Sequence, residues 1–261
     1  GLRINSAKAD ASGIAVASRL TSQIEGLRQA SRNANDAVSM LQTAEGGLQS
    51  MTENLQRMRE LAVQSANGSI SDVERSYLDL EYRQLVQEID RLAESTKFGN
   101  VTLLNGGVDP GDPKFFRFQI GHGTDATDSL NFFVGDYNVG ELGQGKNPDG
   151  TDIPGENPIS GTFISFQGGA QLAIDSVDRA LTTVLSGRAS LGSYQVRFEH
   201  VISNNQIAAE NAQTSRGRIQ DTDFAMESAQ LAKTQVLQQT GIAMLSQANA
   251  MPQQVLTLIQ S

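Results

Sequence analysis

Apolar residues recur at steps of three, four or seven between residues 20 and 58, and this repeat constrains the fold more than any other feature of the sequence. Its members are Leu20, Ile24, Leu27, Ala34, Val38, Leu41, Leu48, Met51, Leu55 and Met58. This spacing places apolar side chains on one face of an α-helix. Because a long helix buries such a stripe most cheaply against other helices, the repeat predicts a rod helix with helical partners.

Two further segments carry helical periodicity. After the turn residues Asn67-Gly68-Ser69, a second helix is predicted from Val73 to about Glu94, with Ser71 or Asp72 available as its cap. Its apolar steps alternate between four and three, which is typical of antiparallel helices that cross at shallow angles. A third helix is predicted from near Gln171. Its interruptions at Gly187 and Gly192 indicate a local irregularity or close packing.

The middle of the chain, residues 105–169, has a different composition. It contains five of the six prolines and many glycines. Short runs at 115–120, 130–134 and 162–166 are typical of strands. We therefore predict a mainly α fold: a long antiparallel helical rod, resembling a coiled-coil bundle, with a β-rich and turn-rich middle excursion.

Charge and residue content exclude several classes of function. The chain has 29 acidic and 20 basic side chains, and its net charge of −9 repels phosphate backbones, so nucleic acid is not expected as a partner. Cysteine is absent, which excludes disulfides and thiolate metal sites. The only histidines, His122 and His200, lie in different zones. We therefore expect no catalytic residues, no metal site, no cofactor and no enzymatic activity.

Two long stretches resemble bacterial flagellin. The first covers residues 1–107 and includes "LQRMRELAVQSANG", and the second covers residues 171–261 and includes "TSRGRIQDTDFAMESAQLAKTQVLQQTG". The resemblance implies a self-assembling subunit of the flagellar filament. In that family, paired terminal helices form the inner tube, a helical rod surrounds them, and the middle segment faces outward. Flagellins also carry a helical stretch ahead of the position of Gly1, which we expect to be missing here.

The resemblance further implies an order of domains, a location and a set of partners. The expected domains are the amino-terminal half of the rod (1–105), the outward-facing middle (106–170), the carboxyl-terminal rod helix (171–215) and the inner-core helix (216–261). The implied location is extracellular, on the flagellum, after secretion through the flagellar export apparatus. The implied partners are further copies of the chain, the export chaperone, hook-associated and cap proteins, and an innate immune receptor.

The carboxyl-terminal segment is almost free of charge. Between Met226 and Ser261 only Glu227 and Lys233 are charged. We interpret it as a polymerisation and chaperone-binding helix that is buried against copies of the chain, with glutamines that hydrogen-bond without the desolvation cost of ions. Those glutamines also interrupt every window that could span a membrane. A core helix within the monomer and a solvent-facing polar helix are the alternatives. The expected contact residues are Leu231, Leu237, Met244, Leu245, Val255, Leu256 and Ile259.

A second candidate site follows from "LQRMRELAVQSAN", which resembles the patch that vertebrate Toll-like flagellin receptors recognise. The matching positions are Arg57 and Leu61, joined from the second helix by Glu88. Residues four apart share a helix face, and an exposed arginine beside an apolar residue makes a suitable interface anchor. The alternative is that Arg57 and Glu88 serve subunit contacts or a surface ion pair.

Two other functions remain open at this point. The hook-filament junction protein shares terminal helices with flagellin, although the quoted motifs favour the filament subunit. A secreted module that binds a glycan or receptor would instead need clustered aromatic residues in the middle zone. Five phenylalanines are there, but their alternation favours a small core over a stacking platform. They are Phe115, Phe116, Phe118, Phe132 and Phe133.

Overall fold

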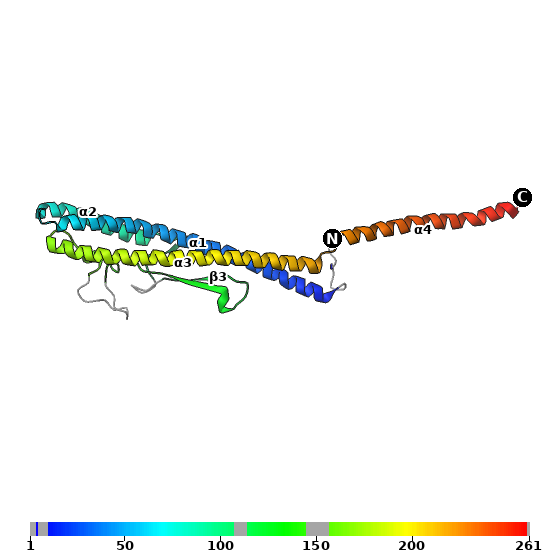
Figure 1. Cartoon of the computed structure of the whole chain (residues 1–261), viewed down its shortest axis with the longest axis horizontal. Coiled ribbons are helices and arrows are strands. Elements are labelled where there is room, and N and C mark those ends of the chain that lie inside the picture. The colour runs from blue at the N-terminus through cyan, green and yellow to red at the C-terminus, as the bar shows by residue number, and fades with distance from the viewer. Residues whose placement is uncertain (1–3, 5–9, 107–113, 145–156, 260–261) are drawn as a thin grey trace. The chain divides into compact units, whose positions relative to one another are not determined.

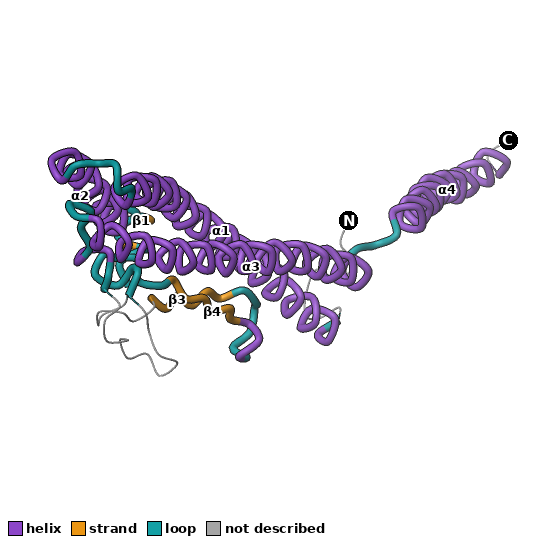
Figure 2. The backbone as a smooth tube through the Cα atoms, turned by 60° about the vertical axis from the view of Figure 1, so that its left-hand side comes forward, coloured by secondary structure: helices purple, strands orange, loops and turns teal. Residues whose placement is uncertain are grey.

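The computed structural model describes residues 4, 10–106, 114–144 and 157–259, with side chains described as far as residue 248. Within these ranges two long helices are followed by two β-hairpins and then by two further long helices (Figures 1 and 2). The mainly helical fold expected from the sequence is therefore confirmed.

The first helix, α1, runs from Ala11 to Ala66 without a break. Asp10 precedes it, and its carboxylate accepts the Gly13 N–H at 2.8 Å, which satisfies one of the free donors at a helix start. The predicted apolar stripe is confirmed as the buried face, with only Leu20 and Val38 partly exposed. Its buried members are Ile24, Leu27, Ala34, Leu41, Leu48, Met51, Leu55 and Met58.

The second helix, α2, runs from Asp72 to Ser95 and begins at a capping box. The Ser71 hydroxyl accepts the Glu74 N–H, while a Glu74 carboxylate oxygen accepts the Ser71 N–H at 2.8 Å. The Ser71 N–H and the Ser71 hydroxyl both donate to the Glu74 carboxylate, and these two hydrogen bonds lower the pKa of Glu74. Because both free backbone donors are satisfied, the chain can leave α1 and start α2 within a short turn. Of the two predicted caps, Ser71 is the one used.

The third long helix, α3, runs from Gln167 to Gln220 as one continuous element. The irregularity predicted at its two glycines is therefore absent, and the close packing is present at one of them. A β-carbon on Gly187 would collide with the Tyr137 hydroxyl, whereas a β-carbon on Gly192 would meet nothing within 4 Å. Gly187 lets the middle segment approach the helix backbone.

Ion pairs show that α1 and α3 run antiparallel. Arg59 contacts Asp178 at 2.6 Å, and Glu45 contacts Arg188 at 2.9 Å. The later residue of α1 thus meets the earlier residue of α3, so the two helices run in opposite directions. Between them and α2 lies an apolar core. Its largest fully buried side chains include Leu41, Leu48, Met51, Leu55, Met58, Tyr82, Ile89 and Phe198.

Two antiparallel hairpins follow α2. The strands β1 (Lys97–Phe98) and β2 (Val101–Thr102) form the first, and β3 (Lys114–Gln119) and β4 (Ser129–Val134) form the second. Alternation along the second hairpin sorts its phenylalanines onto two faces. Phe116, Phe118 and Phe132 pack toward the core beside Phe198, whereas Phe115 and Phe133 form an exposed pair with ring centroids 5.2 Å apart. The prediction of a small aromatic core is correct for the first three.

The third predicted strand, residues 162–166, is not a strand. The segment follows a short 3-10 helix (Ile159–Gly161) and leads directly into α3. Side chains of the neighbouring helices satisfy its backbone instead of a strand partner. The Ile164 N–H donates to Asp79 at 2.8 Å, and the Ile164 carbonyl accepts the Ser65 hydroxyl. The apolar run was predicted as a strand because its burial against helices cannot be recognised from periodicity.

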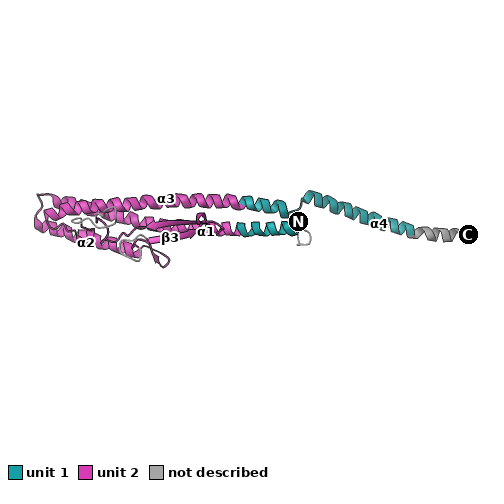
Figure 3. Cartoon of the chain, turned by 90° about the horizontal axis from the view of Figure 1, so that it is seen from below, with its two compact units in different colours: residues 1–24, 210–261 teal, residues 25–209 magenta. Residues whose placement is uncertain are grey.

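The chain divides into two compact units (Figure 3). The larger comprises residues 25–209, and the smaller comprises residues 1–24 and 210–261. In the smaller unit the start of α1 lies beside the end of α3, where an Arg216 nitrogen donates to Thr21 Oγ1 at 3.3 Å. Of the helices that the structure describes, none is long and apolar enough to cross a membrane.

Candidate assembly helix and surface patch

The fourth helix, α4, runs from Phe224 to Ile259 and begins at a carboxylate cap. Asp223 Oδ1 accepts the N–H of Ala225 at 2.9 Å and of Met226 at 3.4 Å. A carboxylate at this position also faces the positive end of the helix dipole. The sequence therefore separates α4 from α3 by a defined stop and restart, and the inner-core helix predicted for residues 216–261 has its own start at residue 224.

The side chains of α4 are exposed throughout residues 224–248. Four predicted contact residues are among them: Leu231 is 57% exposed, Leu237 60%, Met244 71% and Leu245 66%. The side chains of Val255, Leu256 and Ile259 lie outside the described residues. The structure adds four exposed apolar residues that periodicity did not single out, because α4 is apolar on several sides. They are Phe224, Met226, Val236 and Ile242.

Exposure of so many apolar side chains on one helix is unusual for a surface in contact with water. Apolar side chains exposed in such number favour association, since their contact with water is unfavourable. Glu227 and Lys233 are the only charged side chains along the described part of the helix beyond its cap. Burial of this helix would therefore require few ions to be desolvated.

The second candidate site lies on the hairpin of α1 and α2, where Arg57 is held between two acidic residues. Its guanidinium contacts Glu60 at 3.1 Å on the same helix and Glu81 at 2.8 Å on α2. These hydrogen bonds, the one to Glu81 first, raise the pKa of Arg57. The Arg57 side chain remains 49% exposed, so it is oriented by its neighbours while a partner can still reach it.

Glu88 has a different partner. Its carboxylate accepts two hydrogen bonds from Arg91, one helical turn away, at 2.6 and 2.7 Å. This arginine lowers the pKa of Glu88. A direct ion pair between Arg57 and Glu88 does not occur, because each is already paired with a nearer residue of opposite charge. Each of the two residues forms a surface ion pair with a different partner.

Leu61 belongs to the core and not to an exposed patch. It is only 1% exposed and lies in the apolar cluster shared by the three long helices. The expectation of an apolar side chain exposed beside Arg57 is therefore wrong for Leu61. Two residues further along, Val63 is 48% exposed and lines a shallow groove with Glu60 and Arg59. Because Glu60 also pairs with Arg57, the groove adjoins the arginine.

Comparison with protein families identifies both ends of the chain. Residues 1–109 match the description "Bacterial flagellin N-terminal helical region", and residues 174–259 match "Bacterial flagellin C-terminal helical region". The unmatched residues between them include the β3–β4 hairpin.

Individual proteins agree with the family matches. The flagellar filament core protein flaB2 of Brachyspira hyodysenteriae is 42% identical over 265 residues, which cover 100% of this chain and 89% of that protein. The crystal structure of Bacillus cereus flagellin is 28% identical with a TM-score of 0.51, covering 67% of this chain and 88% of the other. A flagellar hook-associated protein from Vibrio parahaemolyticus shares the fold, with a TM-score of 0.64 at 15% identity, over 82% of this chain and 100% of the other.

Proposed function

This chain belongs to the bacterial flagellin family, and on that basis we propose that α4 is the segment through which copies of it assemble. The chain is a structural subunit of the flagellar filament and not an enzyme. Its function is therefore to hold neighbours of the same sequence, and hook-associated proteins are the natural partners at the end of such a filament. The chain contributes to motility as a subunit of the assembled filament.

The exposed apolar surface of α4 is the observation that carries this proposal. Leu231, Leu237 and Leu245 are each more than half exposed, and each gains stability when another helix removes it from water. Fully burying one leucine side chain is worth about 1.5–3 kcal/mol. Several such residues on each copy supply enough free energy to offset the loss of rotational and translational freedom on association.

The balance of residues on α4 suits repeated contact with several neighbours. Exposed glutamines at 230, 235, 238 and 239 offer both donors and acceptors. The glutamine side chains can form hydrogen bonds with a neighbouring subunit in more than one relative position of the two helices. A fixed pattern of charged side chains would allow only one such position. We infer that the apolar residues of α4 supply most of the free energy of assembly and the glutamines its register.

The test replaces three exposed leucines of α4, Leu231, Leu237 and Leu245, by serine in the gene as the bacterium carries it. A matched control replaces three exposed leucines of the larger unit, Leu80, Leu172 and Leu185. We expect the α4 variant to be secreted as monomer without filaments under the electron microscope. Filaments of normal length from the α4 variant would contradict the proposal. The helical content of each purified monomer checks that folding is preserved.

The same exposed helix is suited to an export chaperone and to a cap protein. Before assembly, α4 presents apolar side chains that would cause aggregation, and a chaperone that covers them would keep the subunit fit for export. We propose that the chaperone and neighbouring subunits compete for Leu231 and Leu237. The expected result is that the serine variant described above also loses retention on an immobilised chaperone, while the control variant is retained.

Recognition by an innate immune receptor is a separate proposal that concerns α1 and α2. Arg57 and Glu88 present half-exposed charges, and the adjoining groove presents Val63. A receptor surface with complementary charges and one apolar side chain would fit them. In this arrangement Leu61 does not touch the receptor. Its packing in the core holds the exposed face of α1 in position.

The receptor proposal is tested with Arg57→Ala in a reporter cell line that expresses the vertebrate Toll-like flagellin receptor. Arg28→Ala is the matched control, because Arg28 also forms an exposed ion pair one turn away, with Glu25 at 3.1 Å. We expect about a tenfold loss of potency for Arg57→Ala, since arginine is a frequent hot spot at interfaces. Equal potency of the two variants would contradict a role for Arg57.

A further inference from the structure

The chain contains two Asn-Gly pairs, and the structure places them in opposite surroundings. Asn67-Gly68 lies in the turn between α1 and α2, and Asn105-Gly106 lies after the first hairpin. Glycine leaves the approach to the preceding asparagine uncrowded, because it has no side chain and a wide choice of backbone angles. Its main-chain nitrogen can then reach the asparagine side-chain carbonyl.

At Asn67 the asparagine and the glycine that follows it are open to solvent. Residues 67, 68 and 69 are all exposed, and a β-carbon on Gly68 would meet nothing within 4 Å. The Gly68 N–H has no hydrogen-bond partner among the described residues. The Ser69 N–H donates to Asn67 Oδ1 at 3.2 Å, which polarises the carbonyl that would be attacked.

We propose that Asn67 is a site of spontaneous deamidation. The Gly68 nitrogen loses its proton and bonds to Asn67 Cγ, the bond from Cγ to the amide nitrogen breaks, and ammonia leaves. The product is a five-membered succinimide. Water then opens the ring at either carbonyl, so in sum an amide and a water become a carboxylate and an ammonium ion, without any oxidant or enzyme. Opening at Cγ gives aspartate, and opening at the main-chain carbonyl gives isoaspartate.

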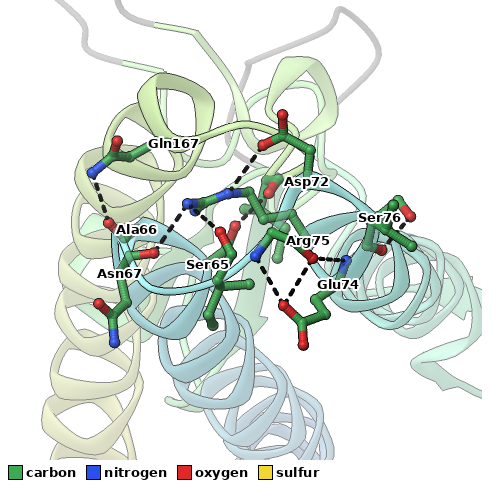
Figure 4. A network of polar contacts seen from close by, with 12 residues as sticks. Ser65, Ala66, Asn67, Asp72, Glu74, Arg75, Ser76 and Gln167 are labelled. Atoms are coloured by element: carbon green, nitrogen blue, oxygen red, sulfur yellow. Dashed lines mark hydrogen bonds and ion pairs between the residues drawn. The ribbon is translucent and has the colours of Figure 1, made fainter.

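Arg75 favours the second product. Its Nη2 donates to the Asn67 main-chain carbonyl at 3.0 Å and to the Ile70 carbonyl at 3.0 Å (Figure 4). The Arg75 side chain is only 5% exposed. Its Nε lies 3.4 Å from an Asp72 carboxylate oxygen in an ion pair, and its Nη1 has no hydrogen-bond partner among the described residues. Ring opening to isoaspartate turns the Asn67 carbonyl that already faces this guanidinium into a carboxylate. The new carboxylate forms beside a buried guanidinium whose Nη1 lacks a hydrogen-bond partner within the described part of the chain.

Asn105 is protected by its surroundings. Gly106 is buried with a φ of +69°, and a β-carbon there would lie 2.6 Å from the Asp136 carboxylate. Asn105 bridges to Asp136 as in an antiparallel sheet, and Lys114 Nζ holds its side-chain oxygen at 2.9 Å. The bridge and the left-handed φ of Gly106 fix the backbone that would have to rotate to close the ring, and the nearby Asp136 carboxylate opposes removal of a proton from the Gly106 nitrogen. The second pair is therefore an internal control.

The experiment incubates the purified chain in mildly alkaline buffer and follows both asparagines by peptide mass spectrometry. We expect a one-dalton gain at Asn67 with loss of ammonia, no comparable gain at Asn105, and isoaspartate as the major product by labelling with an isoaspartyl methyltransferase. Gly68→Ala is the matched variant, because its β-carbon has open space and φ at Gly68 is not left-handed. It should slow the conversion by about tenfold or more, since alanine restricts the backbone rotations that close the ring.

Two outcomes would overturn the proposal. One is conversion of Asn105 at the same rate as Asn67, which would show that the surroundings do not control the chemistry. The other is an unchanged rate in the Gly68→Ala variant, which would exclude attack by the Gly68 nitrogen. Circular dichroism of the variant before incubation confirms that the turn and both helices are intact.

Discussion

The hydroxyl of Tyr82 on α2 lies 2.8 Å from the hydroxyl of Thr162, in the segment that leads into α3. Tyr82 is completely buried, and Thr162 Oγ1 donates in turn to the Ile159 carbonyl at 2.8 Å. One polar chain thus joins α2 to the connection between the middle segment and α3. The polar groups are satisfied although they lie inside the core.

Alkaline titration should weaken the fold through Tyr82. Burial raises its pKa from 10.0 to about 12, so the unfolded chain releases this proton at lower pH than the folded chain. The free energy of unfolding should be unaffected below the unfolded pKa and should fall as pH rises from there to the folded pKa. The expected loss is about 2–3 kcal/mol, measured by urea unfolding at each pH.

Tyr82→Phe supplies the control for that titration. The variant loses one buried hydrogen bond, so it should be less stable at neutral pH by about 1 kcal/mol. Its stability should then fall less steeply on alkaline titration. Some slope should remain, because burial also raises the pKa of Tyr137. If the free energy of unfolding fell equally steeply with pH in both proteins, the pKa of Tyr82 would not be raised by folding.

Replacing two glycines of α3 by alanine should change the free energy of unfolding in opposite directions. Gly187→Ala places a methyl group against the Tyr137 hydroxyl, and the tyrosine must move at a cost of about 1–3 kcal/mol. Gly192→Ala places it in open space and should stabilise the helix by about 0.5–1 kcal/mol. Thermal unfolding of the two variants measures both. Equal effects would mean that Tyr137 does not pack on α3 in solution.

The ion pair between Glu45 and Arg188 should contribute more to stability than the one between Arg59 and Asp178. The first is 2.9 Å long with side chains 28% and 30% exposed, and Glu45 Oε2 is buried with no hydrogen-bond partner in the part of the chain that the structure describes. The second has side chains 47% and 46% exposed. Arg188→Met should cost about 1–3 kcal/mol because it leaves a half-buried carboxylate unpaired.

Arg59→Met is the matched comparison for that ion pair. Exposed pairs of this kind contribute about 0–1 kcal/mol, because water screens the charges. Double-mutant cycles with the acidic partners replaced would separate each pair from its surroundings. A larger coupling energy at Arg59 than at Arg188 would refute the ranking.

The backbone amides of α4 should exchange hydrogen quickly in the monomer and slowly in the filament. In the chain alone, the described side chains of α4 are exposed, and a helix without packing opens readily. The buried part of α3 around Val177 and Phe198 should be protected in both states. Hydrogen-exchange mass spectrometry tests this. Equal protection of α4 before and after assembly would contradict its burial between subunits.

The sequence predicted the helices well because their signals are local. The spacing of Leu48, Met51 and Leu55 specifies both a helix and its buried face, and the Ser71 cap specifies where α2 begins. The scarcity of charge in α4 likewise marks an unusual segment in the sequence alone. Each of these features depends on residues within a turn or two of one another.

Tertiary structure decided what local patterns could not. Leu61 is four residues from Arg57 on the same helix, yet it is buried, because it belongs to the apolar core to which α1, α2 and α3 all contribute. Arg57 meets Glu81 and not Glu88, and the run at 162–166 is held by Asp79 and Ser65 and not by a strand. The sequence by itself determined which segments are helical and which surfaces are apolar. Only the fold decided which residues meet across segments, because the partners in such contacts are distant in sequence and are brought together by packing.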